Sequence, residues 1–191
     1  MSMLRRIAAA VSVLTLAAGV TACGKDDPPS VADSTADFKA ALAGAPAPLR
    51  RELYSRPSVL VDGGKPQFER TLGALRGYPV VVNKWASWCG PCRAEFPVFQ
   101  ELATERGREI AFLGVNGSDS TRKARDFLAK YPIPFPSYED PDEEIARKIK
   151  APANYPITLF LDARGKTAFI HQGGYTSEEQ LAADVDRYLG A

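Results

Sequence analysis

Two cysteines separated by two residues, Cys89 and Cys92, are the side chains of this sequence best suited to chemistry. A CxxC spacing occurs in dithiol exchange centres, in zinc sites and at sites of covalent haem attachment. Zinc needs about four ligands, whereas the only histidine of the chain, His171, lies far from the motif. Haem attachment needs a histidine directly after the second cysteine, where Arg93 stands. A purely structural disulfide across so short a loop would gain little chain entropy, so we predict a reactive dithiol.

The residues around the motif predict that a strand and a helix position it. The range 80–85 begins with three valines and ends with a tryptophan, a composition typical of a buried strand. Apolar residues at helical spacing follow the cysteines, at Phe96, Phe99 and Leu102. Cys89 is therefore expected at a helix N-terminus, where free backbone N–H groups and the helix dipole lower a cysteine pKa from about 8.5 toward about 7. The resulting thiolate is the form that attacks a disulfide.

Periodicity along the rest of the chain predicts an α/β fold with a central mixed β-sheet flanked by helices. Strands are predicted over 80–85, 110–115, 157–161 and 166–171, and helices over 120–130, from 140 and from 176. Asp140 is expected to be the N-cap of the second of these helices. Residues 176–179 read as a capping box that opens the last helix. The last two strands are expected to pair as an antiparallel hairpin.

Three segments are predicted before the α/β domain, which would cover residues 79–191. Residues 1–22 have a basic start and then an uncharged stretch, typical of a secretory signal peptide, with a signal anchor as the alternative. Cys23 ends a Val-Thr-Ala-Cys sequence that looks like a bacterial lipobox, and an incidental cysteine is the alternative. Residues 23–35, rich in Pro, Ser and Asp, predict a lipidated flexible tether. Residues 36–78 predict an N-terminal helical extension.

Composition and charge limit the partners. The chain has 191 residues, of which 45% are hydrophobic, enough for one packed domain with a modest extension. Its 24 basic and 23 acidic residues nearly cancel, so we expect no nucleic-acid partner. The chain has three cysteines, and in an exported protein an odd number would leave one of them without a disulfide partner. Lipidation of Cys23 would leave one reactive pair and attach the protein to the outer side of a bacterial cell membrane.

The block of residues 82–97, Val-Asn-Lys-Trp-Ala-Ser-Trp-Cys-Gly-Pro-Cys-Arg-Ala-Glu-Phe-Pro, resembles the active-site block of TlpA/ResA-type thioredoxins. The resemblance continues through 114–116 and 155–162 to the final helix. It implies a thioredoxin-like fold and thiol:disulfide oxidoreductase activity, with Cys89 as the attacking cysteine and Cys92 as the resolving one. The redox-active group would be their disulfide, with no separate cofactor. The position of Cys92 one turn inside the helix agrees with a buried, waiting thiol.

The same resemblance extends to the surface that would receive substrate. Pro156 matches the cis-proline of the family, which lies against the dithiol and lets the preceding backbone pair with a bound peptide; an ordinary trans proline is the alternative. Tyr155 before it departs from the common pattern and is expected to influence partner choice. Trp88, Gly90 and Pro91 are expected to contribute to substrate binding, with Trp88 as a packing group and a wall of that surface.

Three further residues stand out near the motif. Glu95 corresponds to a glutamate of similar reductases that raises thiol pKa values and moves protons; the alternative is a first-turn helix acid that supports the dipole. Asn83 stands where cytoplasmic thioredoxins carry a buried aspartate. Lys84 stands where an apolar residue is common.

The predicted function is extracytoplasmic exchange of protein disulfides, as a reductase, with cytochrome c maturation as one possible setting. Partners would be protein thiols and a membrane or extracytoplasmic electron-transfer protein. A net disulfide-forming oxidant is the first alternative, because reduction potential decides direction. A peroxiredoxin-like antioxidant, a copper-delivery protein and a non-catalytic binding module are weaker alternatives. The sequence lacks the peroxidatic Cys pattern and methionines beyond Met1 and Met3, and both cysteines would have no purpose in a binding module.

Overall fold

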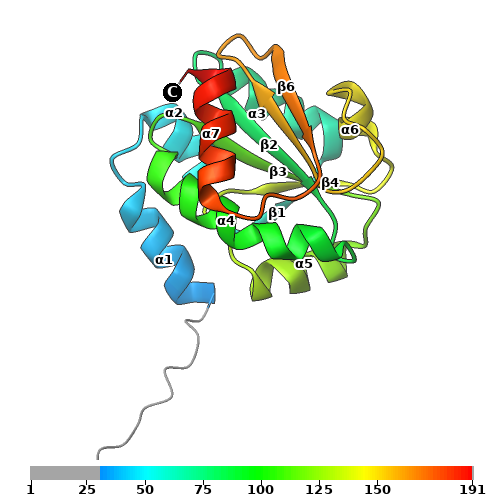
Figure 1. The fold of residues 1–191 in the computed structure, drawn as a ribbon. Helices are drawn as coiled ribbons and strands as arrows, with labels where there is room; N and C mark the ends of the chain where they lie inside the picture. Colours follow the sequence, from blue (N-terminus) through cyan, green and yellow to red (C-terminus); the bar gives the residue numbers. More distant parts are fainter. Residues whose placement is uncertain (1–30, 191) are drawn as a thin grey trace, which may run out of the picture.

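The computed structural model describes residues 31–190. The elements in chain order are α1 (Val31–Ala41), α2 (Ala47–Leu49), the π-helical turn η1 (Arg50–Tyr54), β1 (Leu60–Val61), α3 (Gly64–Ala74), β2 (Val80–Trp85), α4 (Gly90–Arg106), β3 (Ala111–Gly117), α5 (Thr121–Lys130), β4 (Ser137–Asp140), α6 (Glu144–Lys148), β5 (Ile157–Leu161), β6 (Thr167–Gln172) and α7 (Glu178–Leu189). Figure 1 shows their arrangement around one sheet. The alternation of strands and helices predicted from the sequence is confirmed.

A six-stranded mixed sheet forms the centre of the fold, in the order β1-β4-β3-β2-β5-β6. The first four of these strands run parallel, whereas β5 pairs antiparallel with both β2 and β6. The predicted hairpin of the last two strands is therefore confirmed. Every residue of β2 is buried, because helices cover both faces of this central strand. Strand β2 consequently ends at the middle of the carboxyl edge, directly before the two cysteines.

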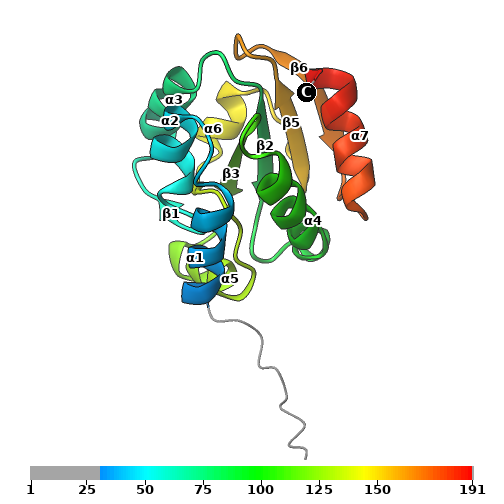
Figure 2. The same cartoon turned by 90° about the vertical axis from the view of Figure 1, so that its left-hand side faces the viewer.

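Helices form a layer on each face of the sheet. Figure 2 shows α4 and α7 together on one face and α3 with α6 on the other. Side chains of successive strand residues point to opposite faces. On β2, Asn83 and Trp85 face the α4 layer, since they contact Glu95 and Phe96, whereas Lys84 faces the α6 side. Neighbouring residues of one strand therefore serve two different sites.

The predicted N-terminal segments need correction. Helix α1 begins at Val31, inside the range predicted as a tether up to residue 35. The range 36–78 is not only helical, because β1 lies within it and pairs with β4 in the main sheet. Its buried apolar residues, including Leu49 and Phe68, belong to the same core as the sheet. The extension is thus part of the domain, while the predicted signal peptide 1–22 and Cys23 lie outside the described residues.

Two predicted helix starts are also wrong in detail. Asp140 ends β4, and α6 begins only at Glu144. The Asp140 carboxylate still accepts hydrogen bonds from the backbone N–H groups of Ile145 and Ala146, both at 2.9 Å, so it serves this helix from a distance. Helix α7 is capped by Ser177, one residue later than the capping box predicted. None of the helices between residues 31 and 190 is both long and apolar enough to span a bilayer.

Candidate active site

Cys89 and Cys92 form a disulfide at the N-terminus of α4, with their Cα atoms 5.3 Å apart. Cys89 is the N-cap residue, and its sulfur accepts a hydrogen bond from the backbone N–H of Cys92 at 3.1 Å. Cys89 retains 4% exposure, whereas Cys92 is completely buried. In the reduced state this N–H and the helix dipole stabilise negative charge on the Cys89 sulfur. The geometry therefore favours Cys89 as the first of the two cysteines to react with another thiol or disulfide.

Asp119 holds the loop that precedes the cysteines, a role that was not predicted. Its carboxylate accepts hydrogen bonds from the Ser87 backbone N–H at 2.6 Å and the Ser87 hydroxyl at 2.9 Å. The Asn116 side chain donates at 3.0 Å and the Ser120 backbone N–H at 2.8 Å. Partial burial alone would raise the pKa of Asp119, but these donors outweigh it and lower the pKa. The carboxylate thus fixes the backbone directly before Trp88.

The predicted substrate-facing residues lie together beside the dithiol. The Tyr155–Pro156 peptide bond is cis, as expected. The rings of Tyr155 and Trp88 meet edge to face, with centroids 5.1 Å apart. Trp88 is 57% exposed, while its indole N–H donates to the carbonyl of Ser118 at 3.0 Å. Gly90 and Pro91 are exposed at the start of α4.

Glu95 lies inside α4 rather than on its solvent-facing first turn, and its side chain is fully buried. Burial raises the pKa of Glu95 from 4.5 to about 8, although hydrogen bonds partly oppose the shift. Asn83 donates to one carboxyl oxygen at 2.7 Å, and the Tyr175 backbone N–H donates to the other at 3.3 Å. The alternative of a first-turn helix acid is therefore wrong. Glu95 can instead gain or lose a proton near neutral pH.

Gly174 marks the point where these parts meet, and it was not predicted. A Cβ added there would lie 3.5 Å from the Pro91 carbonyl oxygen, 3.6 Å from Glu95 Oε2 and 3.7 Å from Pro156 Cγ. The buried carboxyl group, the cis-proline and the motif thus surround one residue of the loop between β6 and α7. No local pattern indicates this position, because the contact joins residues far apart in the sequence.

Other candidate features lie apart from this site. His171, to which no role was assigned, stacks on Tyr175 with ring centroids 4.1 Å apart and lies 3.6 Å from Asp184. Within residues 31–190, no group of three or more His, Cys, Asp or Glu side chains is arranged to hold a metal ion. A cavity of about 570 Å³ is lined by Val80 and Leu161, at the end of β2 opposite the cysteines.

A dithiol on a helix N-terminus, a cis-proline beside it and a mixed sheet in this order define a thioredoxin-like thiol:disulfide oxidoreductase. The chain belongs to the AhpC/TSA family, which matches residues 61–170. Within it, the chain is of the ResA/DsbE type, as the TlpA/ResA resemblance predicted. It is 31% identical over 152 residues to the thioredoxin-like protein YneN of Bacillus subtilis, covering 71% of this chain and 86% of YneN.

Two further relatives carry thiol–disulfide names. The thiol-disulfide oxidoreductase ResA of Oceanobacillus iheyensis is 33% identical over 108 residues, and the match spans 55% of each chain, just over half of its length. The thiol:disulfide interchange protein DsbE of Pseudomonas fluorescens is 32% identical over 131 residues, covering 68% of this chain and 66% of DsbE. The chain is an oxidoreductase of this type.

Solved structures support the same fold. DsbF of Mycobacterium tuberculosis, in its mixed oxidised and reduced forms, has a TM-score of 0.55 and 29% identity, covering 60% of this chain and 84% of DsbF. A DsbF homologue from Corynebacterium diphtheriae has a TM-score of 0.53 and 28% identity, covering 61% and 75%. The predicted thioredoxin-like fold is thereby confirmed.

Proposed function

We propose that this oxidoreductase works outside the cytoplasm as a reductase of protein disulfides, through the Cys89–Cys92 pair. The observation that carries the proposal is the unequal placement of the two sulfurs. Cys89 Sγ lies at the open helix end and accepts the Cys92 N–H, whereas Cys92 is completely buried behind it. Such a pair can begin exchange through one sulfur and finish it through the other.

The reaction follows from this order. The Cys89 thiolate attacks one sulfur of a substrate disulfide, that bond breaks, and the first substrate sulfur leaves as a thiolate that takes up a proton. The Cys92 thiol then loses its proton and attacks Cys89 in the mixed disulfide. The second substrate thiol leaves, and the Cys89–Cys92 bond forms. Two electrons and two protons pass to the substrate, and the dithiol itself is the redox group, so no separate cofactor is invoked.

Glu95 is proposed to take and return the proton of Cys92. It lies on α4 after Cys92, and its carboxyl group is shielded from solvent. A pKa near 8 lets the group exchange a proton at the pH of the reaction. In its ionised form the carboxylate would also disfavour a neighbouring thiolate, so Glu95 is proposed to favour a reducing pair.

The surface around Cys89 is proposed to bind a polypeptide. Trp88 and Tyr155 offer an aromatic contact, and the exposed backbone at Gly90 and Pro91 leaves the approach open. The backbone before Pro156 is proposed to pair with the bound segment. A cleft of about 390 Å³ on the other side of Trp88 adds space for side chains that flank the reacting cysteine.

The location is proposed from the start of the chain. Residues 1–22 would direct export, Cys23 would carry the lipid, and the following segment would hold the domain at the outer face of the bacterial cell membrane. The dithiol would be kept reduced by a membrane or extracytoplasmic electron-transfer protein. Apocytochrome c in cytochrome c maturation is one candidate substrate. Mass spectrometry of the exported chain, with Cys23→Ser as the control, tests the lipid, and an unmodified Cys23 contradicts it.

The direction of electron flow is decided by one quantity, the reduction potential of the Cys89–Cys92 pair. The helix N-terminus stabilises a reduced thiolate, which favours an oxidant, whereas the buried Glu95 opposes it. We expect a reduction potential close to the value of about −270 mV found for thioredoxin. Equilibration of the Cys23→Ser chain with glutathione gives this value. A potential near about −120 mV, typical of a strong oxidant, contradicts the reductase and supports the alternative.

Trapping tests the order of attack. Cys92→Ser leaves Cys89 able to form the mixed disulfide but unable to release it, so partner proteins should accumulate on Cys89 in cells. Cys89→Ser is the matched control and should trap none. Equal trapping by both variants contradicts the assigned roles.

A further inference from the structure

Lys84 is the only charged residue of β2, and its side chain is completely buried. A buried ammonium group is costly unless it is paired and hydrogen-bonded. Its Nζ lies 2.9 Å from Glu143 Oε2 and donates to the carbonyl of Pro152 at 2.9 Å. It also lies 4.0 Å from the centroid of the Tyr155 ring. A carboxylate, a carbonyl oxygen and an aromatic ring thus surround the ammonium group.

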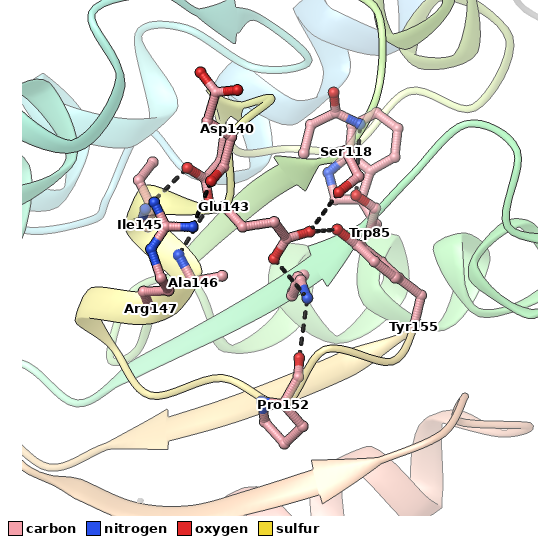
Figure 3. Close-up of polar contacts among 12 residues, drawn as sticks. Trp85, Ser118, Asp140, Glu143, Ile145, Ala146, Arg147, Pro152 and Tyr155 are labelled. Carbon is pink, nitrogen blue, oxygen red and sulfur yellow. Dashed lines mark hydrogen bonds and ion pairs between the residues drawn. The ribbon is translucent and has the colours of Figure 1, made fainter.

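Glu143 connects this lysine to two loops beside the dithiol. Figure 3 shows its carboxylate pointing toward Tyr155 and Ser118. Both hydroxyls donate to Glu143 Oε1, that of Ser118 at 2.9 Å. Partial burial would raise the pKa of Glu143, but the hydrogen bonds from Tyr155, Lys84 and Ser118 lower it overall. Glu143 is therefore ionised at neutral pH and forms a true ion pair.

The backbone is shaped to bring these groups together. Ser118 and Glu143 have positive φ angles of 48° and 57°, which is unusual for residues other than glycine. Strained backbone of this kind persists where the surroundings enforce it. Gly117 lies against the same groups. A Cβ added there would lie 2.8 Å from Glu143 Oε1 and would also collide with the Tyr155 hydroxyl. We call Lys84, Ser118 and Glu143 the positioning cluster.

The positioning cluster reaches the surface next to the dithiol. Tyr155 is held by Glu143 through its hydroxyl and by the lysine through its ring. Trp88 is held by the carbonyl of Ser118 through its indole N–H. We call the edge-to-face pair of Trp88 and Tyr155 the aromatic wall. The positioning cluster thus holds both rings of the aromatic wall, although Trp88 is mostly exposed.

We propose that the positioning cluster fixes the aromatic wall so that the enzyme prefers polypeptide substrates with an aromatic or aliphatic side chain next to the reacting cysteine. An apolar residue in place of Lys84 could fill the same volume, but it would give no directional contact to hold the two rings. A rigid pair of rings offers an apolar side chain a preformed contact at little entropic cost. The proposal rests on the proposed substrate surface.

The experiment compares two disulfide-linked peptides that differ only in Phe or Gly after the cysteine. For the wild type we expect kcat/KM to favour the Phe peptide about two- to tenfold, the range of one aromatic contact. Lys84→Met keeps an unbranched buried side chain but removes the charge, and should bring the ratio close to one, mainly through KM. Its rate with hydroxyethyl disulfide, too small to contact the wall, should stay unchanged. Tyr155→Phe keeps the ring and should lower the ratio in part.

Lys148→Met is the matched control, because Lys148 is 60% exposed and pairs with Glu69 away from the dithiol. It should leave the ratio unchanged. If Lys84→Met does not fold, Tyr155→Phe carries the test alone, since it removes only one hydroxyl. A ratio near one in the wild type, or an unchanged ratio in both variants, overturns the proposal. So does a parallel loss with hydroxyethyl disulfide, which would mean that the dithiol itself is disturbed.

The selectivity does not depend on the direction of electron flow. The same peptides can be offered as dithiols to the oxidised enzyme, and the wall contacts them in the same way. If the pair proves to be an oxidant, the proposed function fails while the Phe-to-Gly ratio remains measurable. If the measured potential shows a reductant but kcat/KM is the same for the Phe and Gly peptides, the proposed function stands and only the proposal on substrate preference fails.

Discussion

Two buried charged sites lie behind the dithiol, on opposite faces of β2. On the α4 side, Asn83 faces Glu95, which has no ion-pair partner among residues 31–190 and a pKa raised to about 8 by burial. On the α6 side, Lys84 is paired with Glu143, whose pKa is lowered. The comparison shows how burial and hydrogen-bond donors together set the pKa of an acid: the fully buried Glu95 becomes titratable near neutral pH, whereas the partly exposed Glu143 keeps its charge because Tyr155, Lys84 and Ser118 all donate to it. The first site suits proton transfer and the second suits positioning.

Neutralising the unpaired acid should give the largest effect on stability. Because the pKa of Glu95 rises from 4.5 to about 8 on folding, the folded state binds more protons than the unfolded state between these pH values. The free energy of unfolding therefore falls as pH rises through this window. Glu95→Gln should remove that fall, so its stability relative to wild type increases with pH by up to roughly 5 kcal/mol. Urea unfolding of the oxidised proteins at about pH 5 and about pH 8.5 measures it.

Glu101→Gln is the control for this experiment, since Glu101 is an exposed acid on the same helix. Its stability should follow the wild type at both pH values. If the Glu95→Gln and wild-type curves run parallel, the carboxyl group does not hold a raised pKa, and its proposed role in proton transfer fails.

Removing the acid of the paired site should act in the opposite sense. Glu143→Ala leaves the fully buried Lys84 without its carboxylate and should destabilise the fold by roughly 3 kcal/mol at neutral pH. Glu69→Ala, which breaks the exposed pair with Lys148, should cost less than about 1 kcal/mol. Thermal and urea unfolding measure both. Adding Lys84→Met to Glu143→Ala should recover part of the loss, and a fully additive double variant would show that the two residues are not coupled.

The smallest effect is expected from the hydrogen bond between Asn83 and Glu95. This bond favours the charged carboxylate and lowers its pKa. Asn83→Ala should therefore raise the pKa of Glu95 further, by about one unit, and move the midpoint of the pH–rate profile of exchange upward. Thr158→Val is the control, because the buried Thr158 hydroxyl on the neighbouring strand has no hydrogen-bond partner within the described part of the chain. A profile that shifts equally in both variants, or downward in Asn83→Ala, contradicts the assignment.

Local sequence patterns were sufficient to predict those strands, helices and turns that neighbouring residues specify. The apolar run of β2, the hairpin of β5 and β6 and the stripe of α7 are readable because each buries a periodic set of side chains. The motif at the start of α4 and the cis bond before Pro156 were predicted from residue type and resemblance. These features need only a few neighbouring residues to specify them.

Features that depend on distant contacts were missed. Strand β1 has two residues, and β4 alternates without a clear apolar face, so neither gives a strand signal. Glu143, Ser118 and Asp119 lie in loops, where no periodicity applies. One signal was present: Lys84, the one charged residue in a buried strand, required a partner, although the sequence did not reveal that Glu143 supplies it.

The pairing of β1 with β4 also bears on how the chain can be shortened. Without residues before Pro79, β4 would become the outer strand of the sheet, with unpaired backbone groups facing solvent. The apolar surface covered by Phe68 and Leu75 would be uncovered at the same time. A free strand edge beside exposed apolar surface promotes association between chains. The part of the domain that precedes Pro79 therefore acts as protection against aggregation, and a soluble version of the protein should begin no later than Val31.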